Sequence, residues 1–289
     1  MRPRSGHTES QPALIGILRL SGLVPIACFR HQYVVSETQT STIEQLPTRG
    51  ERPLLTARLN RSVRLSEQTK HLEFRVEGVE ALAFVPGQFI SIKQARPDGK
   101  EHTRAYSFAS APRQDPSFDV CLNRVGEGFL SNWLCNLEEG EVIQFHGPHG
   151  LFTLREPRTD AVFIATGTGI APIRGMVHWL FEKPERNRGH EYWLVFGTRH
   201  EENIYYRQEF EQIARENPNF HYVPTLSRGG ETWNGCRGYV QDHVREIVAG
   251  RPGMHAYICG LHLMVDANRK LLKEGLGWDR KQIVFERYD

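Results

Sequence analysis

The chain has 289 residues, a length typical of two domains of ordinary size. Apolar residues make up 39% of it and charged residues 24%, which excludes a disordered, collagen-like or coiled-coil chain. With a net charge of +2, the chain lacks the excess of basic residues that is typical of a nucleic-acid-binding protein. The five cysteines are widely spaced and form no CxxC pair, which argues against structural zinc and a disulfide scaffold and favours a reducing compartment.

The N-terminal region differs from the rest of the chain. Residues 13–29 are mostly apolar and follow two arginines, as in a secretory signal, but Arg19 interrupts the run and no small-residue cleavage site follows. The run is also too short for a membrane span. We therefore expect residues 1–52 to form an extension and polar linker without stable membrane insertion, in a cytoplasmic protein. An organelle presequence in residues 1–35 is the alternative, because arginines outnumber acids there.

The next hundred residues show the pattern of short strands separated by turns. Expected strands cover residues 56–65, 71–79, 88–95, 118–125 and 141–147. One helix is expected over 128–137. This spacing is typical of an antiparallel β-barrel or sandwich, which we assign to residues 53–156.

After Asp160 the pattern changes to strands that alternate with helices. Expected strands cover 161–165, 191–196, 220–226, 255–259 and 281–285, and expected helices cover 170–181, 206–217, 239–249 and 261–274. Helices of this length between strands indicate βαβ units and a parallel sheet. Residues 157–289 are therefore expected to form a Rossmann-like α/β domain.

A glycine-rich turn follows the first strand of this α/β region. Its sequence is Gly167-Thr168-Gly169-Ile170-Ala171-Pro172. A turn of this kind lets a phosphate approach the backbone and the N-terminus of the next helix. The turn lacks the full G-x-G-x-x-G fingerprint, so an ordinary βαβ connection is the alternative.

In the β-region, Arg104-Ala105-Tyr106-Ser107 is expected at the start of a strand. A guanidinium binds phosphate through two parallel hydrogen bonds. A tyrosine two residues later shares its face of the strand and can stack on a planar ring. An ordinary strand with one solvated arginine is the alternative.

Two further motifs stand where ligands bind in such folds. Gly128 and Ser131 flank an expected helix start, where they either cradle a phosphate or serve only as a helix cap. Cys259-Gly260 ends an expected parallel strand, at the sheet edge that binds ligands. A cysteine there is otherwise a small buried residue.

Taken in this order, R-x-Y-S, G-x-x-S, G-T-G-I-A-P and C-G resemble the motifs of the ferredoxin–NADP reductase family. The resemblance spans about Leu54 to Asp289. It implies a β-barrel that binds FAD and a Rossmann-like domain that binds NAD(P)H. It also implies that the flavin accepts a hydride and passes single electrons to a partner.

The resemblance assigns roles to individual residues. Arg104 would hold the FAD pyrophosphate, Tyr106 would pack on the isoalloxazine and Ser107 would bond near flavin N5. Gly128 and Ser131 would contact the FAD phosphates.

On the coenzyme side, the resemblance places Thr168 between nicotinamide and flavin and Cys259 beside nicotinamide C4. Tyr288 would cover the flavin face that nicotinamide must enter, although Asp289 follows it where relatives end in tyrosine. Ser107, Cys259 and Tyr288 are thus the expected catalytic residues, and the glycine turn with Gly260 binds the coenzyme. Leu261 replaces the family's proline, which questions the helix geometry there.

Arginines after two strands bear on the choice of coenzyme. Arg199 follows the second Rossmann strand, Ser227-Arg228 follows the third, and Arg237 comes shortly after. They match positions that bracket the 2′-phosphate in NADPH-using relatives, and guanidinium suits that dianion. We therefore expect NADPH, with NADH as the alternative. Tyr239 is a candidate adenine stacker or a helix-start residue packed on the sheet.

The electron acceptor is expected to be a separate molecule, because the sequence lacks the cysteine spacing of a plant-type [2Fe–2S] domain. A basic helix–turn region over residues 93–104 could meet an acidic ferredoxin or flavodoxin, or be a solvated loop. We expect a monomer. The alternative functions are an NADH-dependent flavin or quinone reductase, the reductase component of an oxygenase, and a flavin-binding subunit without coenzyme turnover.

Overall fold

The computed structural model describes residues 53–288. Its first part is a six-stranded antiparallel sheet with the order β4-β3-β6-β1-β2-β5. The strands are β1 (Leu55–Arg64), β2 (Thr69–Val76), β3 (Phe89–Ala95), β4 (Glu101–Ser107), β5 (Ser117–Asn123) and β6 (Val142–His149). An isolated bridge between Phe108 and Val120 joins the two edge strands, so the sheet curls into a barrel around a core rich in phenylalanine. The single α-helix of this part, α1 (Phe129–Asn136), contributes Leu130 and Leu134 to that core.

The basic stretch over residues 93–104 is not the expected helix–turn. It forms the end of β3, a turn and most of β4, because Gly99 adopts a positive φ of 80° that closes a hairpin. The Arg96 carbonyl accepts a hydrogen bond from the Gly99 amide (2.9 Å) within this turn. Arg104 to Ser107 consequently ends a strand rather than starting one.

The second part is a parallel six-stranded sheet with the order β10-β9-β8-β7-β11-β12. Its strands are β7 (Ala161–Thr166), β8 (Tyr192–Thr198), β9 (Phe220–Leu226), β10 (Cys236–Arg237), β11 (His255–Leu261) and β12 (Ile283–Tyr288). The central strand β7 is buried on both faces, as expected for an apolar run in a parallel sheet. The predicted fold class, an antiparallel β-barrel followed by a Rossmann-like sheet, is confirmed.

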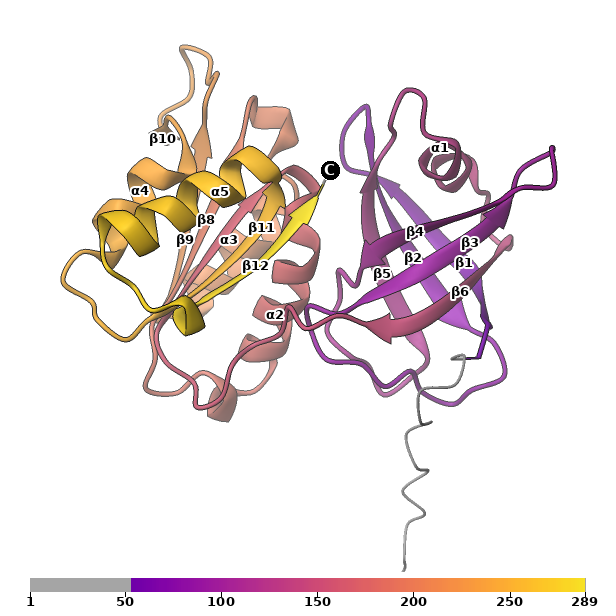
Figure 1. Cartoon of the computed structure of the whole chain (residues 1–289), viewed down its shortest axis with the longest axis horizontal. Coiled ribbons are helices and arrows are strands. Elements are labelled where there is room, and N and C mark those ends of the chain that lie inside the picture. The colour runs from indigo at the N-terminus through magenta and orange to yellow at the C-terminus, as the bar shows by residue number, and fades with distance from the viewer. Residues whose placement is uncertain (1–52, 289) are drawn as a thin grey trace, which may run out of the picture. The chain divides into compact units, whose positions relative to one another are not determined.

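Four helices cover this sheet in two pairs. Their bounds are α2 (Ile170–Glu182), α3 (Arg207–Glu216), α4 (Val240–Val248) and α5 (His262–Lys270). Apolar residues of α2 and α3 pack on one face of β7, and those of α4 and α5 pack on the other, where Figure 1 shows the two helices together. The short helical turns are η1 (Gly167–Gly169), η2 (Pro184–Arg186), η3 (Glu201–Asn203), a π-helical turn η4 (Leu271–Gly275) and η5 (Arg280–Gln282). Within residues 53–288, none of the helices has the length and apolar character needed to cross a bilayer.

Strand β5 departs from the half-buried alternation that its sequence shows. All five of its central residues are buried. Phe118 and Val120 face the barrel core, whereas Cys121 packs against Ala171 of α2 and Tyr206. The second face of β5 is therefore covered by the α/β part of the chain.

A charged cluster accompanies this contact. Arg174 of α2 donates to the Ala109 carbonyl (2.6 Å), to Asp119 of β5 (3.2 Å) and, through two nitrogens, to both carboxylate oxygens of Glu209 on α3 (2.7 and 3.0 Å). His178 of α2 also bonds to Glu209 (2.5 Å). Burial by itself would raise the pKa of Glu209, but the hydrogen bonds from His178 and Arg174 outweigh it and lower the pKa to about 2.

This lowered pKa predicts an acid-dependent loss of stability. Because Glu209 has a lower pKa when folded than its ordinary 4.5, its charged partners stabilise the fold above that value. The contribution should disappear as pH falls from about 4.5 towards about 2. We expect Glu209→Gln to lower the free energy of unfolding in urea at pH 7, with the difference from wild type shrinking between pH 5 and pH 3. Glu216→Gln, on the exposed end of the same helix, is the control; an equal, pH-independent loss in both variants would contradict the assignment.

Candidate functional site

The glycine turn and the Cys-Gly motif interlock at the carboxyl edge of the parallel sheet. They meet because β7 and β11 are neighbouring strands in register. A Cβ on Gly169 would come within 2.3 Å of the Cys259 carbonyl oxygen. A Cβ on Gly260, whose φ is +144°, would lie 2.4 Å from Thr166 Oγ1. Two motifs some ninety residues apart thus need glycine for the same reason, a close approach of two backbones.

The turn leads directly into helix α2. Gly167 has a positive φ of 54°, and Thr168 is partly exposed within η1. Pro172 is the third residue of α2, where its missing N–H costs no intrahelical hydrogen bond. The partly exposed turn and the positive end of a 13-residue helix form a surface suited to a phosphate group.

Strand β12 carries the C-terminal residues back to the barrel. The Tyr288 hydroxyl donates to Ser107 Oγ (2.6 Å), and Ser107 Oγ donates to Glu286 Oε1 (3.0 Å). The Cys259 thiol also interacts with the Tyr288 side chain. The structure therefore brings together the three residues expected to be catalytic. Burial raises the pKa values of both Cys259 and Tyr288, so both are neutral at physiological pH.

Two polar residues of this site were missed by the sequence reasoning. Glu286 accepts the hydrogen bond from Ser107, and burial raises the pKa of its carboxyl. Its spacing of two from Tyr288 on one strand was the available signal. Thr166 directly precedes the glycine turn, and its Oγ1 is buried without a hydrogen-bond partner among the described residues. A buried hydroxyl of this kind points to a group that the polypeptide does not supply.

On the barrel, Arg104 and Tyr106 lie two residues apart on edge strand β4, opposite Ile92 and Ile90 of β3. Arg104 is exposed, and within residues 53–288 its guanidinium donates only to the adjacent Thr103 carbonyl (2.9 Å). Tyr106 packs partly against the barrel core, and this burial raises its pKa. The guanidinium is therefore accessible, and the ring is held in place.

The loop before α1 is organised by its own side chains. Ser131 Oγ accepts from the Val125 amide and donates to the Gly128 carbonyl (both 3.2 Å), and Asn132 bonds to the Gly128 carbonyl (2.7 Å). A Cβ on Gly128 would collide with Ser131 Oγ at 2.6 Å. Gly128 is the N-cap of α1, so the backbone of this turn, rather than the Ser131 hydroxyl, is available to a ligand.

Three arginines are expected to select the coenzyme. They lie at or just after the carboxyl ends of three adjacent strands, β8, β9 and β10. Arg228 donates its amide to the Arg199 carbonyl (2.9 Å), and both side chains are exposed beside Ser227. Arg237 pairs with Leu226 across β10 and β9. Its guanidinium donates to the carbonyls of Gly229, Gly230 and Trp233 (2.7 Å each). Arg237 thus holds the loop after β9, which carries Arg228.

Tyr239 lies at the start of α4, next to this loop. Its side chain is 65% exposed, so the alternative that it packs on the sheet is wrong. The exposed ring is available for stacking.

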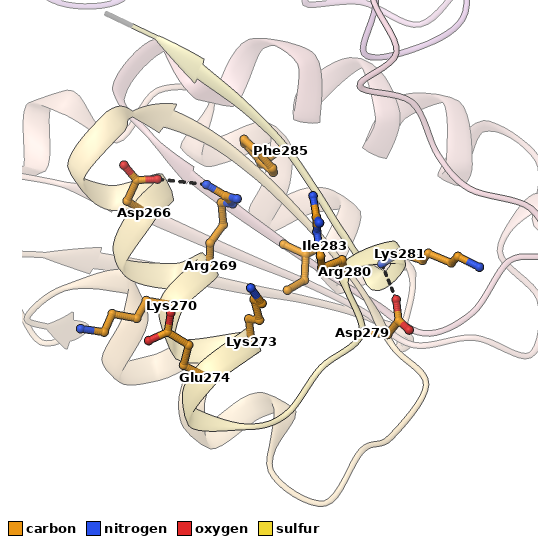
Figure 2. Close-up of a pocket in the computed structure, with 10 residues that line it drawn as sticks. All are labelled: Asp266, Arg269, Lys270, Lys273, Glu274, Asp279, Arg280, Lys281, Ile283 and Phe285. Carbon is orange, nitrogen blue, oxygen red and sulfur yellow. Dashed lines mark hydrogen bonds and ion pairs between the residues drawn. The ribbon is translucent and has the colours of Figure 1, made fainter.

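A separate groove of about 1000 Å³ lies along α5, η4 and β12. Figure 2 shows its lining residues, which include five cations and three acids. The dashed lines mark the bonds of two of these acids, Asp266 to Arg269 and Asp279 to the Lys281 amide. Lys270, Lys273, Arg280 and Lys281 have no ion-pair partner within residues 53–288, so the groove is positively charged.

Comparison with known proteins supports this arrangement. Residues 56–154 match the family model described as the oxidoreductase FAD-binding domain, and residues 163–270 match the oxidoreductase NAD-binding domain.

Among curated proteins, the chain is 42% identical over 233 residues to ferredoxin–NADP reductase B of Sorangium cellulosum, covering 78% of this chain and 93% of that protein. It is 34% identical to the glycine betaine monooxygenase reductase subunit of Pseudomonas aeruginosa, over 68% of this chain but only 54% of that longer protein. The solved structure of an Amycolatopsis cytochrome P450 reductase superposes with a TM-score of 0.72 at 28% identity, covering 82% of this chain and 70% of that one.

The interlock of the two glycine motifs makes a specific prediction. Gly260→Ala should lower the free energy of unfolding by about 1–3 kcal/mol more than Gly253→Ala, because overpacking adds to backbone strain. Gly253 also has a positive φ (87°), but a Cβ there meets nothing within 4 Å. Thermal and urea unfolding of both variants measure the difference. Equal losses would show that the contact with Thr166 relaxes without cost.

Proposed function

Because the chain belongs to the ferredoxin–NADP reductase family of FAD-dependent oxidoreductases, we propose that it carries electrons between NADPH and a separate ferredoxin or flavodoxin. The observation that carries this proposal is the convergence of Ser107 from the barrel with Cys259 and Tyr288 from the neighbouring strands β11 and β12 of the parallel sheet. We propose residues 53–156 as the FAD-binding domain and 157–289 as the NAD(P)-binding domain of a cytoplasmic monomer.

The described residues fit the two cofactors. Arg104 presents an exposed guanidinium, Tyr106 a fixed ring, and the turn at Gly128 an open backbone, which suit a dinucleotide and a flavin ring. The unpartnered Thr166 hydroxyl and the glycine turn suit a nicotinamide coenzyme at the edge of the sheet. Bound FAD supplies the conversion between a two-electron hydride and single electrons.

The protein's part in this chemistry is orientation. Ser107 offers its hydroxyl toward flavin N5, while Cys259 and Thr168 hold the nicotinamide ring in place. Tyr288, now bonded to Ser107, must leave that position when nicotinamide enters. Glu286 holds Ser107 from the other side by accepting a hydrogen bond from its hydroxyl. No general base is required.

The choice of NADPH rests on the exposed guanidinium groups of Arg199 and Arg228. Together with Ser227 they stand at the ends of β8 and β9, where the adenosine end of the coenzyme lies in Rossmann-like sheets. A 2′-phosphate is the partner that their charge favours. We assign Tyr239 to stacking on the adenine.

An acidic acceptor protein suits the positively charged groove. Its unpaired cations come from α5, η4 and η5, and the groove is also lined by β12, the strand that ends at Tyr288. The basic β3–β4 hairpin is a weaker candidate, because Lys93 is already paired with Glu101 (2.7 Å). The similarity to an oxygenase reductase subunit supports a second candidate, delivery of electrons from NADH to an oxygenase.

An anaerobic spectrum tests the function. The purified protein should be yellow, and the flavin band should bleach on addition of NADPH more readily than on addition of NADH. Oxidised ferredoxin or flavodoxin should then restore the band. Bleaching by NADH alone would favour the oxygenase reductase, and no bleaching by either coenzyme would exclude both enzymes.

The arginines give a second prediction. Arg228→Ala should lower the preference for NADPH over NADH, measured as the ratio of kcat/KM values, by about tenfold or more, because a charge-assisted bond to phosphate contributes about 1.5–3 kcal/mol. Arg245→Ala, an exposed arginine on α4, is the control. Equal losses for both coenzymes would contradict a 2′-phosphate role.

A further inference from the structure

A largely buried polar cluster, to which the proposed function assigns no role, joins the barrel to the α/β sheet. We call it the joint; it consists of His71, Asp119, Arg174, Tyr206 and Glu209. Asp119 is 1% exposed, and the Arg174 side chain is 13% exposed. His71 bonds through Nδ1 to the Tyr206 hydroxyl (3.0 Å). The cluster therefore contains members from β2 and β5 of the barrel and from α2 and α3 of the sheet.

Arg174 makes the largest number of hydrogen bonds in the joint, and they reach both sides. Its Nε and Nη2 donate hydrogen bonds to the two carboxylate oxygens of Glu209, and its Nη1 donates to the Ala109 carbonyl and to Asp119. The guanidinium also lies over the Tyr206 ring, 4.8 Å from its centre. Only a planar group with several fixed donors can make these contacts at once, which excludes lysine as an equivalent.

The surroundings of Arg174 leave little freedom. A Cβ on its neighbour Gly175 would lie 2.7 Å from the Ser110 carbonyl oxygen, so α2 touches the barrel backbone directly. Tyr206 has a positive φ of 58°, a rare conformation for a residue with a side chain. Strain of this kind persists where packing on every side determines the position.

The joint lies between the two cofactor-binding segments. The carbonyl that Arg174 holds belongs to Ala109, two residues after Ser107. The helix that carries Arg174 begins directly after the turn Gly167–Gly169. One side chain therefore connects the segment that offers a hydroxyl to the flavin with the turn that receives the coenzyme.

We propose that Arg174 is a positioning residue for electron transfer, which fixes the nicotinamide-binding turn relative to the flavin-side Ser107. This inference rests on the proposed function. It predicts that the loss of Arg174 slows transfer between bound cofactors more than it weakens the binding of either one, since a small misplacement of reacting groups costs much rate.

Charge compensation does not account for Arg174. Asp119 is already paired with Arg113 through two bonds of 2.8 Å, and Arg113 belongs to the barrel itself. Glu209 retains His178. Without Arg174 neither carboxylate is left unpaired, and what is lost is the link that its guanidinium makes between Glu209 on one side and Asp119 and the Ala109 carbonyl on the other.

The pairing with Arg113 also provides a matched control. Arg113→Met removes two bonds to Asp119 but none that crosses the joint, whereas Arg174→Met removes the crossing bonds to Asp119 and the Ala109 carbonyl. Each variant, loaded with FAD, is mixed anaerobically with NADPH or 4-deuterated NADPH in a stopped-flow instrument. The limiting rate of flavin reduction, the apparent Kd for NADPH and the isotope effect are measured.

For Arg174→Met, we expect a limiting rate lower by about tenfold or more, with the Kd within about threefold and the isotope effect retained. Arg174→Lys should be intermediate, and Arg113→Met should stay within about twofold of wild type. Equal losses in Arg113→Met and Arg174→Met, or an unchanged rate in Arg174→Met, would overturn the proposal.

A second variant covers the case in which Arg174→Met does not fold. Gly175→Ala keeps every charge but pushes α2 away from Ser110, so it too should lower the limiting rate while FAD stays bound. An unchanged rate in this variant, together with one in Arg174→Lys, would also overturn the proposal. Wild-type protein that neither NADPH nor NADH reduces would instead reject the proposed function.

Discussion

The hydrogen bond between Tyr288 and Ser107 joins residues 181 positions apart and depends on nearly every other feature of the fold. Ser107 ends an edge strand of the barrel, and Tyr288 ends an edge strand of the parallel sheet. The ends of these two strands can meet only if the barrel and the parallel sheet are held in one fixed spatial relation. The contact of α2 with β5 and the Ala109 carbonyl provides that relation, and it explains why β5 is buried on both faces.

The features that could be predicted from the sequence are those with local physical signals. An apolar strand followed by Gly-Thr-Gly and a long helix indicates one βαβ unit, and β7 with α2 has this form. The neighbourhood of Cys259 and the glycine turn followed from the family resemblance and from the rule that parallel strands end at one edge. The close approach of the two backbones could not be predicted from the sequence. A Cβ on Gly169 would meet Cys259, and a Cβ on Gly260 would meet Thr166.

Other features carried a weak local signal or none. Strand β10 has two residues and exists only because β9 offers it an edge. The prediction of a helix–turn in place of the β3–β4 hairpin is wrong because the charged residues there hide the alternation of apolar and polar residues that indicates a strand. Gly99 was the available turn signal. The bonds of Arg237 to three carbonyls could not be foreseen either, since a guanidinium after a strand serves a ligand or a loop with the same sequence. Glu286 is important only through Ser107, which lies in the other sheet.

The polar character of the joint is informative about its purpose. Burying charges costs desolvation free energy, and an apolar contact of the same size is often as stable or more so. Apolar surfaces, however, tolerate sliding, because dispersion forces have little directionality. Charge-assisted hydrogen bonds have narrow ranges of distance and angle, so a guanidinium that bonds to a carboxylate on one side and a carbonyl on the other fixes an orientation. A protein that must hold two cofactors at a set separation gains more from that geometry than from additional stability.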